Sequence, residues 1–256
     1  MENYQLGISE AISTGWEYAK KYGLLIAVIY LVVSMVSSGL QSITGSSVDL
    51  DVYREMGESI GRGDWEDVGR YAERLNGGLG SSFGTWIGYL VTIVVNAALY
   101  NLALGLMSGR FTEVTFDAFK LPAQTYLKVV AVELLTGIAI FISVLFCVVP
   151  FFFVAPRLVL APVYQVQNPE AGVFDSIKAS WDMTTGNTFS MLGLGISTFG
   201  INILGFFCCC IGFYFTQTIE LFALIAAFYQ LGGGGAAASI SASADGYNTD
   251  GYSKTE

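Results

Sequence analysis

The chain has 256 residues, of which 53% are hydrophobic and only 13% are charged, and its formal net charge is −9. Soluble domains carry about 25% charged residues, so this composition argues against an ordinary water-soluble domain and predicts an integral membrane protein. The acidic balance argues against nucleic acid as a partner, and a sequence without histidine lacks the commonest general base and metal ligand.

Long stretches without Asp, Glu, Lys or Arg predict membrane-crossing helices. Such stretches cover 22–48, 83–109 and 189–219. A helix needs about 20 apolar residues to cross the hydrocarbon. The sequence therefore predicts an all-α, polytopic transmembrane helix bundle with about six spans in a single membrane domain, residues 1–231. The expected spans lie near 22–40, 84–108, 129–149, 150–166, 189–208 and 212–231.

Three short segments, each preceding a predicted pair of spans, share one pattern. Apolar residues recur at helical spacing beside acidic residues, which predicts amphipathic helices in the cytoplasmic interface of the membrane. Trp16 and Trp181 are the expected interfacial anchors. The likeness favours an internal repeat of three units, although interfacial helices of this kind also occur without any repeat. The apolar stripes are Ile8, Ile12 and Trp16; Phe116, Phe119 and Ala123; and Phe174, Ile177 and Trp181.

The outer loop, residues 41–83, is rich in charge. Its pattern predicts two short amphipathic helices near 49–59 and 64–76, with Asp64 as the N-cap of the second. A cap that is solvated or lies in the interface is the favoured interpretation over a binding site. The loop reads as an insertion into the first of the three repeated units.

The lysines predict the orientation. With a cytoplasmic N-terminus and six spans, every lysine and one arginine near a span end fall inside, as is typical of inner-membrane proteins. Four arginines in the outer loop weaken this argument but do not reverse it, because the bias concerns short loops and residues close to the span ends. Both termini are therefore expected in the cytoplasm, with the protein in the inner (cytoplasmic) membrane. The inside residues are Lys20, Lys21, Arg110, Lys120, Lys128, Lys178 and Lys254.

The stretch 150–166 is the least regular of the predicted spans. Pro150 is its first residue, and Pro156 and Pro162 lie further inside it. Prolines are tolerated in membrane helices when neighbours satisfy the freed backbone groups. The stretch is expected to cross the membrane, and a kinked or re-entrant segment is the alternative.

Ionisable residues inside predicted spans are costly and usually face a partner or water. Depths counted at about 1.5 Å per residue place Arg157 and Glu220 at a similar level, which predicts an ion pair with Glu133 nearby. The favoured role of this intramembrane polar cluster is to join helices, and the alternative is an ion-linked transport site. The cluster comprises Glu133, Arg157, Glu220, Asn96 and Asn101, with Asn202 as a further polar group.

Small residues are expected to allow close helix contacts. The glycines expected to do so are Gly105, Gly137, Gly193, Gly195 and Gly200.

Helix signals flank the third amphipathic segment. Asn168, Pro169 and Glu170 predict a helix start, and Gly186 with Asn187 predicts its stop. The stretch from Pro156 to Asn187 resembles a signature of poorly characterised bacterial six-helix membrane proteins. These proteins are similar to the membrane domain that accompanies some glycerophosphodiester phosphodiesterases. The sequence has no counterpart of their catalytic domain, so the resemblance implies a fold and supplies no functional residues.

The four cysteines and the tail complete the sequence. Cys147 and the run Cys208 to Cys210 lack metal-binding spacing, so they are interpreted as apolar filler, with a disulfide to Cys147 left open. We expect no catalytic residue, no metal and no cofactor. Four glycines open a tail, residues 232–256, that is predicted to be disordered and cytoplasmic.

The predicted function is that of a non-enzymatic membrane component, such as a scaffold or an envelope-organising protein. The alternative is a small transporter or a permease subunit that uses Arg157, Glu220 and Glu133. The expected partners are the lipid bilayer and either a second copy of the chain or other membrane proteins.

Overall fold

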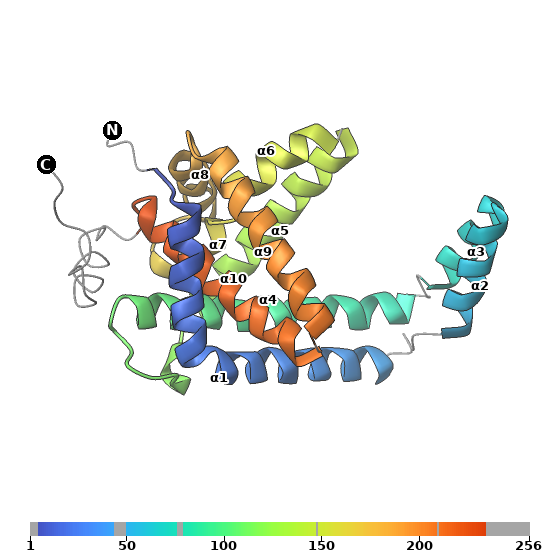
Figure 1. The fold of residues 1–256 in the computed structure, drawn as a ribbon, viewed down its shortest axis with the longest axis horizontal. Coiled ribbons are helices and arrows are strands. Elements are labelled where there is room, and N and C mark those ends of the chain that lie inside the picture. The colour runs from blue at the N-terminus through green and yellow to red at the C-terminus, as the bar shows by residue number, and fades with distance from the viewer. Residues whose placement is uncertain (1–4, 44–49, 76–78, 147, 209, 234–256) are drawn as a thin grey trace, which may run out of the picture. The chain divides into compact units, whose positions relative to one another are not determined.

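The computed structural model describes residues 5–43, 50–75, 79–146, 148–208 and 210–233. Within these ranges the chain forms ten α-helices and one short 3-10 helix, and no strand (Figure 1). The all-helical fold is therefore confirmed. The chain divides into two compact units, and each is described by itself: unit 1 is Met1–Ile29 with Val94–Glu256, and unit 2 is Tyr30–Ile93.

Five helices of the described chain are long enough and apolar enough to cross a membrane, which makes this a multi-pass membrane protein. They contain or overlap the predicted spans near 22–40, 84–108, 129–149, 189–208 and 212–231. The five are α1 (Ile8–Ile43), α4 (Leu79–Met107), α5 (Ala123–Phe146), α9 (Thr188–Cys208) and α10 (Cys210–Gln230).

The predicted span over 150–166 is not one continuous helix. Its residues fall in α6 (Val148–Leu158) and α7 (Ala161–Gln167), which are separated by Val159 and Leu160. The break follows from Pro162, which has no backbone N–H to donate to the carbonyl of Leu158, the last residue of α6. Neither short helix could cross the hydrocarbon alone.

Together, α6 and α7 run back along α5. Both short helices pack against α5. Near the start of α5, Lys128 Nζ donates hydrogen bonds of 2.6 and 3.1 Å to the carbonyls of Pro169 and Ala171, which follow α7. The end of α7 therefore lies beside the start of α5, so the two short helices run antiparallel to the long one.

The start of α1 and the end of α10 meet in unit 1. The backbone N–H of Gly7 donates a 3.0 Å hydrogen bond to Oε1 of Gln230. The N–H of Leu6 donates one of 3.1 Å to Oδ1 of Asn187, directly before α9. The beginnings of α1 and α9 and the end of α10 therefore share one end of the unit.

Small residues on α1 allow it to pack closely on α10. Ala11, Gly15, Ala19 and Gly23 recur every four residues and so share one face of the helix, and both alanines are completely buried. A Cβ on Gly15 would lie 2.8 Å from the carbonyl oxygen of Ile219. Only glycine fits at this contact, which is the small-residue packing of membrane helices.

The glycines expected at close helix contacts behave differently from one another. A Cβ on Gly105 would meet the ring of Phe111, and one on Gly193 would lie 2.8 Å from Ile8 Cδ1. The other three have open space where a Cβ would stand: Gly137, Gly195 and Gly200.

Unit 2 contains the two short helices predicted for the outer loop, α2 (Leu50–Arg62) and α3 (Trp65–Leu75). They are joined at Gly63, whose φ of 73° favours glycine. Asp64 Oδ1 accepts a 3.2 Å hydrogen bond from the N–H of Asp67, which confirms the predicted N-cap.

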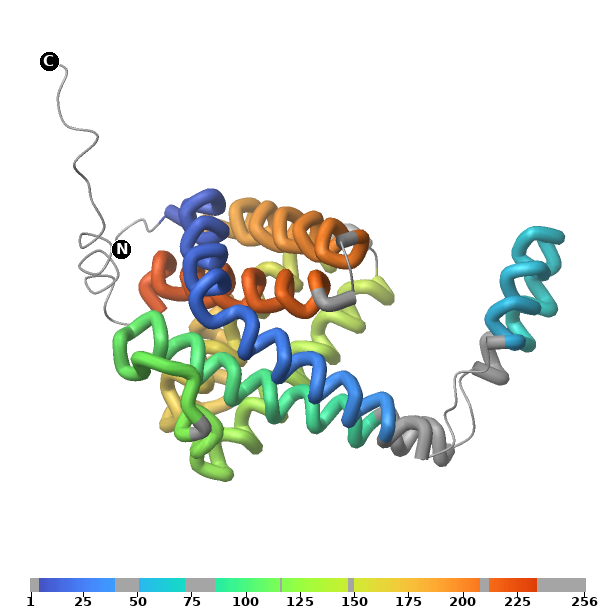
Figure 2. The backbone as a smooth tube through the Cα atoms, turned by 60° about the horizontal axis from the view of Figure 1, so that its bottom comes forward, coloured from blue at the N-terminus to red at the C-terminus, as the bar shows by residue number. Residues whose placement is uncertain are grey.

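The three segments compared as repeats adopt different secondary structures. The first forms the beginning of α1, which changes direction in its first half (Figures 1 and 2). The second is the 3-10 helix η1 (Phe116–Phe119), and the third is α8 (Val173–Thr184). The predicted start of the third at Asn168 was wrong, because Asn168 ends α7 and α8 begins after Gly172. The predicted stop is confirmed by Gly186, whose φ is 90°.

Large apolar side chains line the outside of the long helices, and hydroxyls lie inside unit 1. On α9, Phe199, Leu204 and Phe207 are each about two-thirds or more exposed, whereas Thr188 and Thr198 are buried. Exposure of so many large apolar side chains would be unfavourable in water, whereas it is favourable against lipid. The predictions about the disulfide and the tail rest on Cys147, Cys209, the side chains of Cys208 and Cys210, and residues 234–256, which lie outside the described part of the chain.

Candidate functional site

Arg157 lies on the last turn of α6 and contacts two other helices. Its Nε donates a 3.1 Å hydrogen bond to the hydroxyl of Thr188, the first residue of α9. Its guanidinium carbon lies 4.5 Å from the ring centre of Trp181 on α8. The ring quadrupole attracts a cation in this position. Arg157 therefore joins α6 to both α8 and α9.

A row of hydroxyl side chains faces the break between α6 and α7. The hydroxyl of Ser180 donates a 2.6 Å hydrogen bond to the carbonyl of Arg157, and Thr184 donates to the same carbonyl at 3.4 Å. This carbonyl lies one residue before the end of α6, where the helix no longer supplies a partner. The hydroxyls of α8 thus satisfy the backbone that the break leaves free.

The buried amide of Gln165 has a similar role on α7. The hydroxyl of Ser176 donates a 2.9 Å hydrogen bond to Gln165 Oε1, and Gln165 Nε2 donates to the carbonyl of Ala171 at 3.2 Å. Gln165, Ser176 and Ser180 are all fully buried. The predicted cluster did not include these residues. The sequence does hold a signal for part of the set, because Ser176, Ser180, Thr184 and Thr188 follow one another at intervals of four.

Glu220 lies on α10 and faces α9. Its Oε2 accepts a 2.6 Å hydrogen bond from Nδ2 of Asn202 on α9. The amide oxygen of Asn202 is buried and makes no hydrogen bond. Among the described residues, no lysine or arginine forms an ion pair with Glu220.

The predicted ion pair between Arg157 and Glu220 is not present in the described structure. Arg157 contacts α9 at Thr188, whereas Glu220 contacts the same helix at Asn202, 14 residues further on (202 − 188). At 1.5 Å per residue, those contact points are about 21 Å apart. The depth estimate assumed that 150–166 forms one continuous helix. The helix is broken after Leu158, and Arg157, on the last turn of α6, lies beside the beginning of α9.

The other predicted members of the cluster also lie apart. Glu133 is half-buried on α5 and makes no ion pair within the described residues, and Asn96 is half-buried on α4. Asn101 is buried near the end of α4, where its Nδ2 donates a 2.9 Å hydrogen bond to the carbonyl of Ala118 and its Oδ1 accepts one from Arg110. Asn101 therefore fixes the segment that follows α4. The structure does not bring the five predicted residues into one site.

The two predicted interfacial tryptophans are partly exposed. Trp16 is 46% exposed and meets the ring of Phe215 edge-on at 6.1 Å between centroids. Trp181 is 38% exposed beneath the Arg157 guanidinium. Each ring is thus held on one side by the protein and open on the other.

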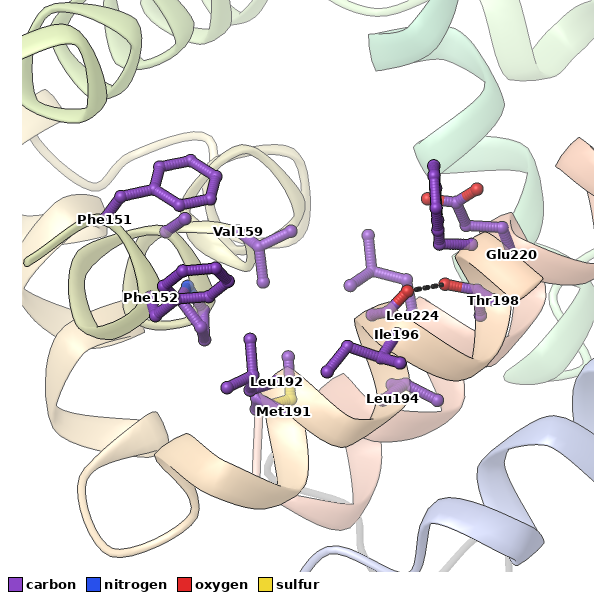
Figure 3. A pocket seen from close by; sticks show the side chains of 14 residues that line it. Phe151, Phe152, Val159, Met191, Leu192, Leu194, Ile196, Thr198, Glu220 and Leu224 are labelled. Carbon is purple, nitrogen blue, oxygen red and sulfur yellow. Dashed lines mark hydrogen bonds between the residues drawn. The ribbon is translucent and has the colours of Figure 1, made fainter. Parts of the chain in front are cut away.

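An apolar cavity of about 580 Å³ lies between α6, α9 and α10 (Figure 3). Its walls are almost entirely hydrophobic, and Glu220 is the charged residue among them. Pro156 lines it from α6, and Thr198 lines it from α9. The lining residues are Phe151, Phe152, Ala155, Pro156, Val159, Met191, Leu192, Leu194, Gly195, Ile196, Thr198, Phe199, Glu220 and Leu224.

The described side chains hold no group of three or more Cys, Asp or Glu residues placed to bind a metal ion. Comparison with protein-family models, curated proteins and solved structures found no match to this chain. The cavity that Glu220 borders is therefore the candidate site on geometry alone.

Proposed function

We propose that the chain crosses the membrane six times and that α6 and α7 together make the fourth, broken crossing. The contact between Gly7 and Gln230 supports an even number of crossings, because it brings the beginning of α1 to the end of α10. The antiparallel course of α6 and α7 along α5 supplies the crossing that the five long helices lack. Hydroxyl and amide side chains offset the cost of the break.

The proposed orientation places this end of unit 1 in the cytoplasm of a bacterial cell, in keeping with the lysines near the span ends. In this arrangement α8 lies in the interface with Trp181 as an anchor, and the beginning of α1 packs along α10. The resemblance to bacterial six-helix membrane proteins is consistent with the same arrangement.

The function we propose is that of a non-enzymatic membrane scaffold or envelope-organising component. One observation carries it: Arg157 and its neighbours Ser180 and Thr188 are engaged in contacts between helices. Polar contacts of this kind hold a bundle in one arrangement and leave its apolar outer faces for lipid, for a second copy or for other membrane proteins.

The test compares Arg157→Met and Glu220→Gln with the unaltered protein in vesicles. A scaffold requires that Arg157→Met lower the yield of assembled protein and that the vesicles show no specific ion or solute flux. Intact assembly of both variants together with an altered flux would contradict the scaffold function.

A small transporter or permease subunit is the second candidate, and the cavity favours it. The cavity adjoins the proline-containing α6 and carries a carboxylate near the middle of α10, and broken helices near the bilayer midplane mark many transport sites. Solute flux through reconstituted vesicles that is lost in Glu220→Gln would establish this function over the first.

A further inference from the structure

We propose that the cavity between α6, α9 and α10 is a binding site for a lipophilic organic cation, with Glu220 as its counter-ion. This inference goes beyond the scaffold function, and it names the ligand class that the second candidate would move.

The negative charge of Glu220 favours a cationic ligand. A carboxylate in an apolar wall is costly unless it is neutralised by a partner or by a proton. Within the described residues, Glu220 has the hydrogen bond from Asn202 and no basic partner. The carboxylate of Glu220 therefore favours a positive charge at this place.

Most of the other lining residues of the cavity are hydrophobic, so they favour a cation that carries large apolar groups. Figure 3 shows Phe151 and Phe152 on one side of the cavity and Glu220 on the other. Aromatic rings accept both hydrocarbon and cationic groups. A volume of about 580 Å³ suits a ligand of drug size. A hydrated metal ion would leave the hydrophobic walls unused, and a neutral lipid chain would leave Glu220 unpaired.

The first test is equilibrium binding of tetraphenylphosphonium to the purified full chain in detergent. We expect the probe to bind, and we expect Glu220→Gln to weaken its affinity by about tenfold or more. The glutamine can still accept the hydrogen bond from Asn202, so loss of charge is separated from loss of packing. Glu133→Gln, which removes an intramembrane carboxylate outside the cavity, should change the affinity by less than about twofold. Tetraphenylborate, of similar shape and opposite charge, should not bind when it is titrated alone in place of the probe.

The second test fills the cavity. Gly195 lines it and Gly200 does not, and both lie on α9 with open space where a Cβ would stand. Gly195→Leu should abolish binding of tetraphenylphosphonium, and Gly200→Leu should leave it unchanged, with both variants equally monodisperse.

No binding by the unaltered chain, or equal binding by the unaltered chain and Glu220→Gln, would overturn the inference. Loss of binding in Gly200→Leu but not in Gly195→Leu would also overturn it. Binding without flux in vesicles would leave the inference intact and remove the transporter function, so the two can fail separately.

Discussion

Arg157 joins three helices through its side chain and its backbone. The guanidinium contacts Thr188 and Trp181, and the carbonyl accepts a hydrogen bond from Ser180. A proline-broken segment leaves backbone groups without helical partners, and a membrane supplies no water to replace them. These contacts therefore stabilise the break between α6 and α7 inside the bundle.

Replacement of Arg157 by methionine tests its side-chain contacts. Arg157→Met keeps a long apolar stem but loses the hydrogen bond to Thr188 and the cation–π contact with Trp181. We expect a loss of about 1–2 kcal/mol in the free energy of unfolding, measured by titration with SDS in mixed micelles. Arg157→Lys should recover part of the loss. An unfolding free energy unchanged in Arg157→Met would show that the contacts contribute nothing.

Replacement of Ser180 by alanine tests the backbone contact. Ser180→Ala removes the shorter of the two hydroxyl hydrogen bonds to the carbonyl of Arg157, so the same titration should show a loss of about 1 kcal/mol. Ser197→Ala is the matched control, because Ser197 donates to Gly193 within its own helix α9. Equal effects of the two variants would contradict a special role for the contact at the break.

At the scale of elements, α1 and α10 are held by close backbone contact. Gly15 has no room for a Cβ against the carbonyl oxygen of Ile219 and the backbone nitrogen of Ala223. Backbone atoms cannot rotate away as a side chain can, so a larger residue must separate the helices. This contact also brings the beginning of α1 against the second half of α10.

Gly15→Leu should therefore destabilise the protein by about 3 kcal/mol, at the upper end of the cost of overpacking. Gly39→Leu is the control on the same helix, because Gly39 has open space in place of a Cβ. The measurement is the thermal midpoint in detergent, followed by size-exclusion chromatography with fluorescence detection. A Gly15→Leu variant as stable as Gly39→Leu would contradict the close packing.

The sequence predicts the elements better than it predicts their contacts. Hydrophobic stretches locate the five long helices, and Asp64 locates the start of α3, because both signals are local. Pro162 predicts a break in the helix, but it does not predict that α6 ends at Leu158. The position of that end determines where Arg157 contacts α9. Distance along a helix estimates depth, and it does not say which neighbour a side chain faces. For that reason the pairing of Arg157 with Glu220 was wrong, and the partners Thr188 and Asn202 were not foreseen.

At the scale of the whole molecule, the membrane topology depends on the number of crossings. An even number follows if the beginning of α1 and the end of α10, joined by Gly7 and Gln230, lie on one side of the membrane. Lys128 joins the beginning of α5 to the turn after α7, and this contact favours one side of the membrane for that turn and for the segment before α5. If α6 and α7 entered and left on one side, the turn after α7 would lie on the opposite side.

Labelling of single cysteines with a membrane-impermeant maleimide tests this claim most directly. Each cysteine is introduced into a variant whose four native cysteines are replaced by alanine. Along the chain, Asp117→Cys precedes α5 and Glu170→Cys follows α7. Glu66→Cys marks the outer loop. Six crossings predict that Asp117→Cys and Glu170→Cys are protected in intact cells and labelled after lysis, while Glu66→Cys is labelled in both. Labelling of Glu170→Cys in intact cells while Asp117→Cys stays protected would contradict the crossing by α6 and α7.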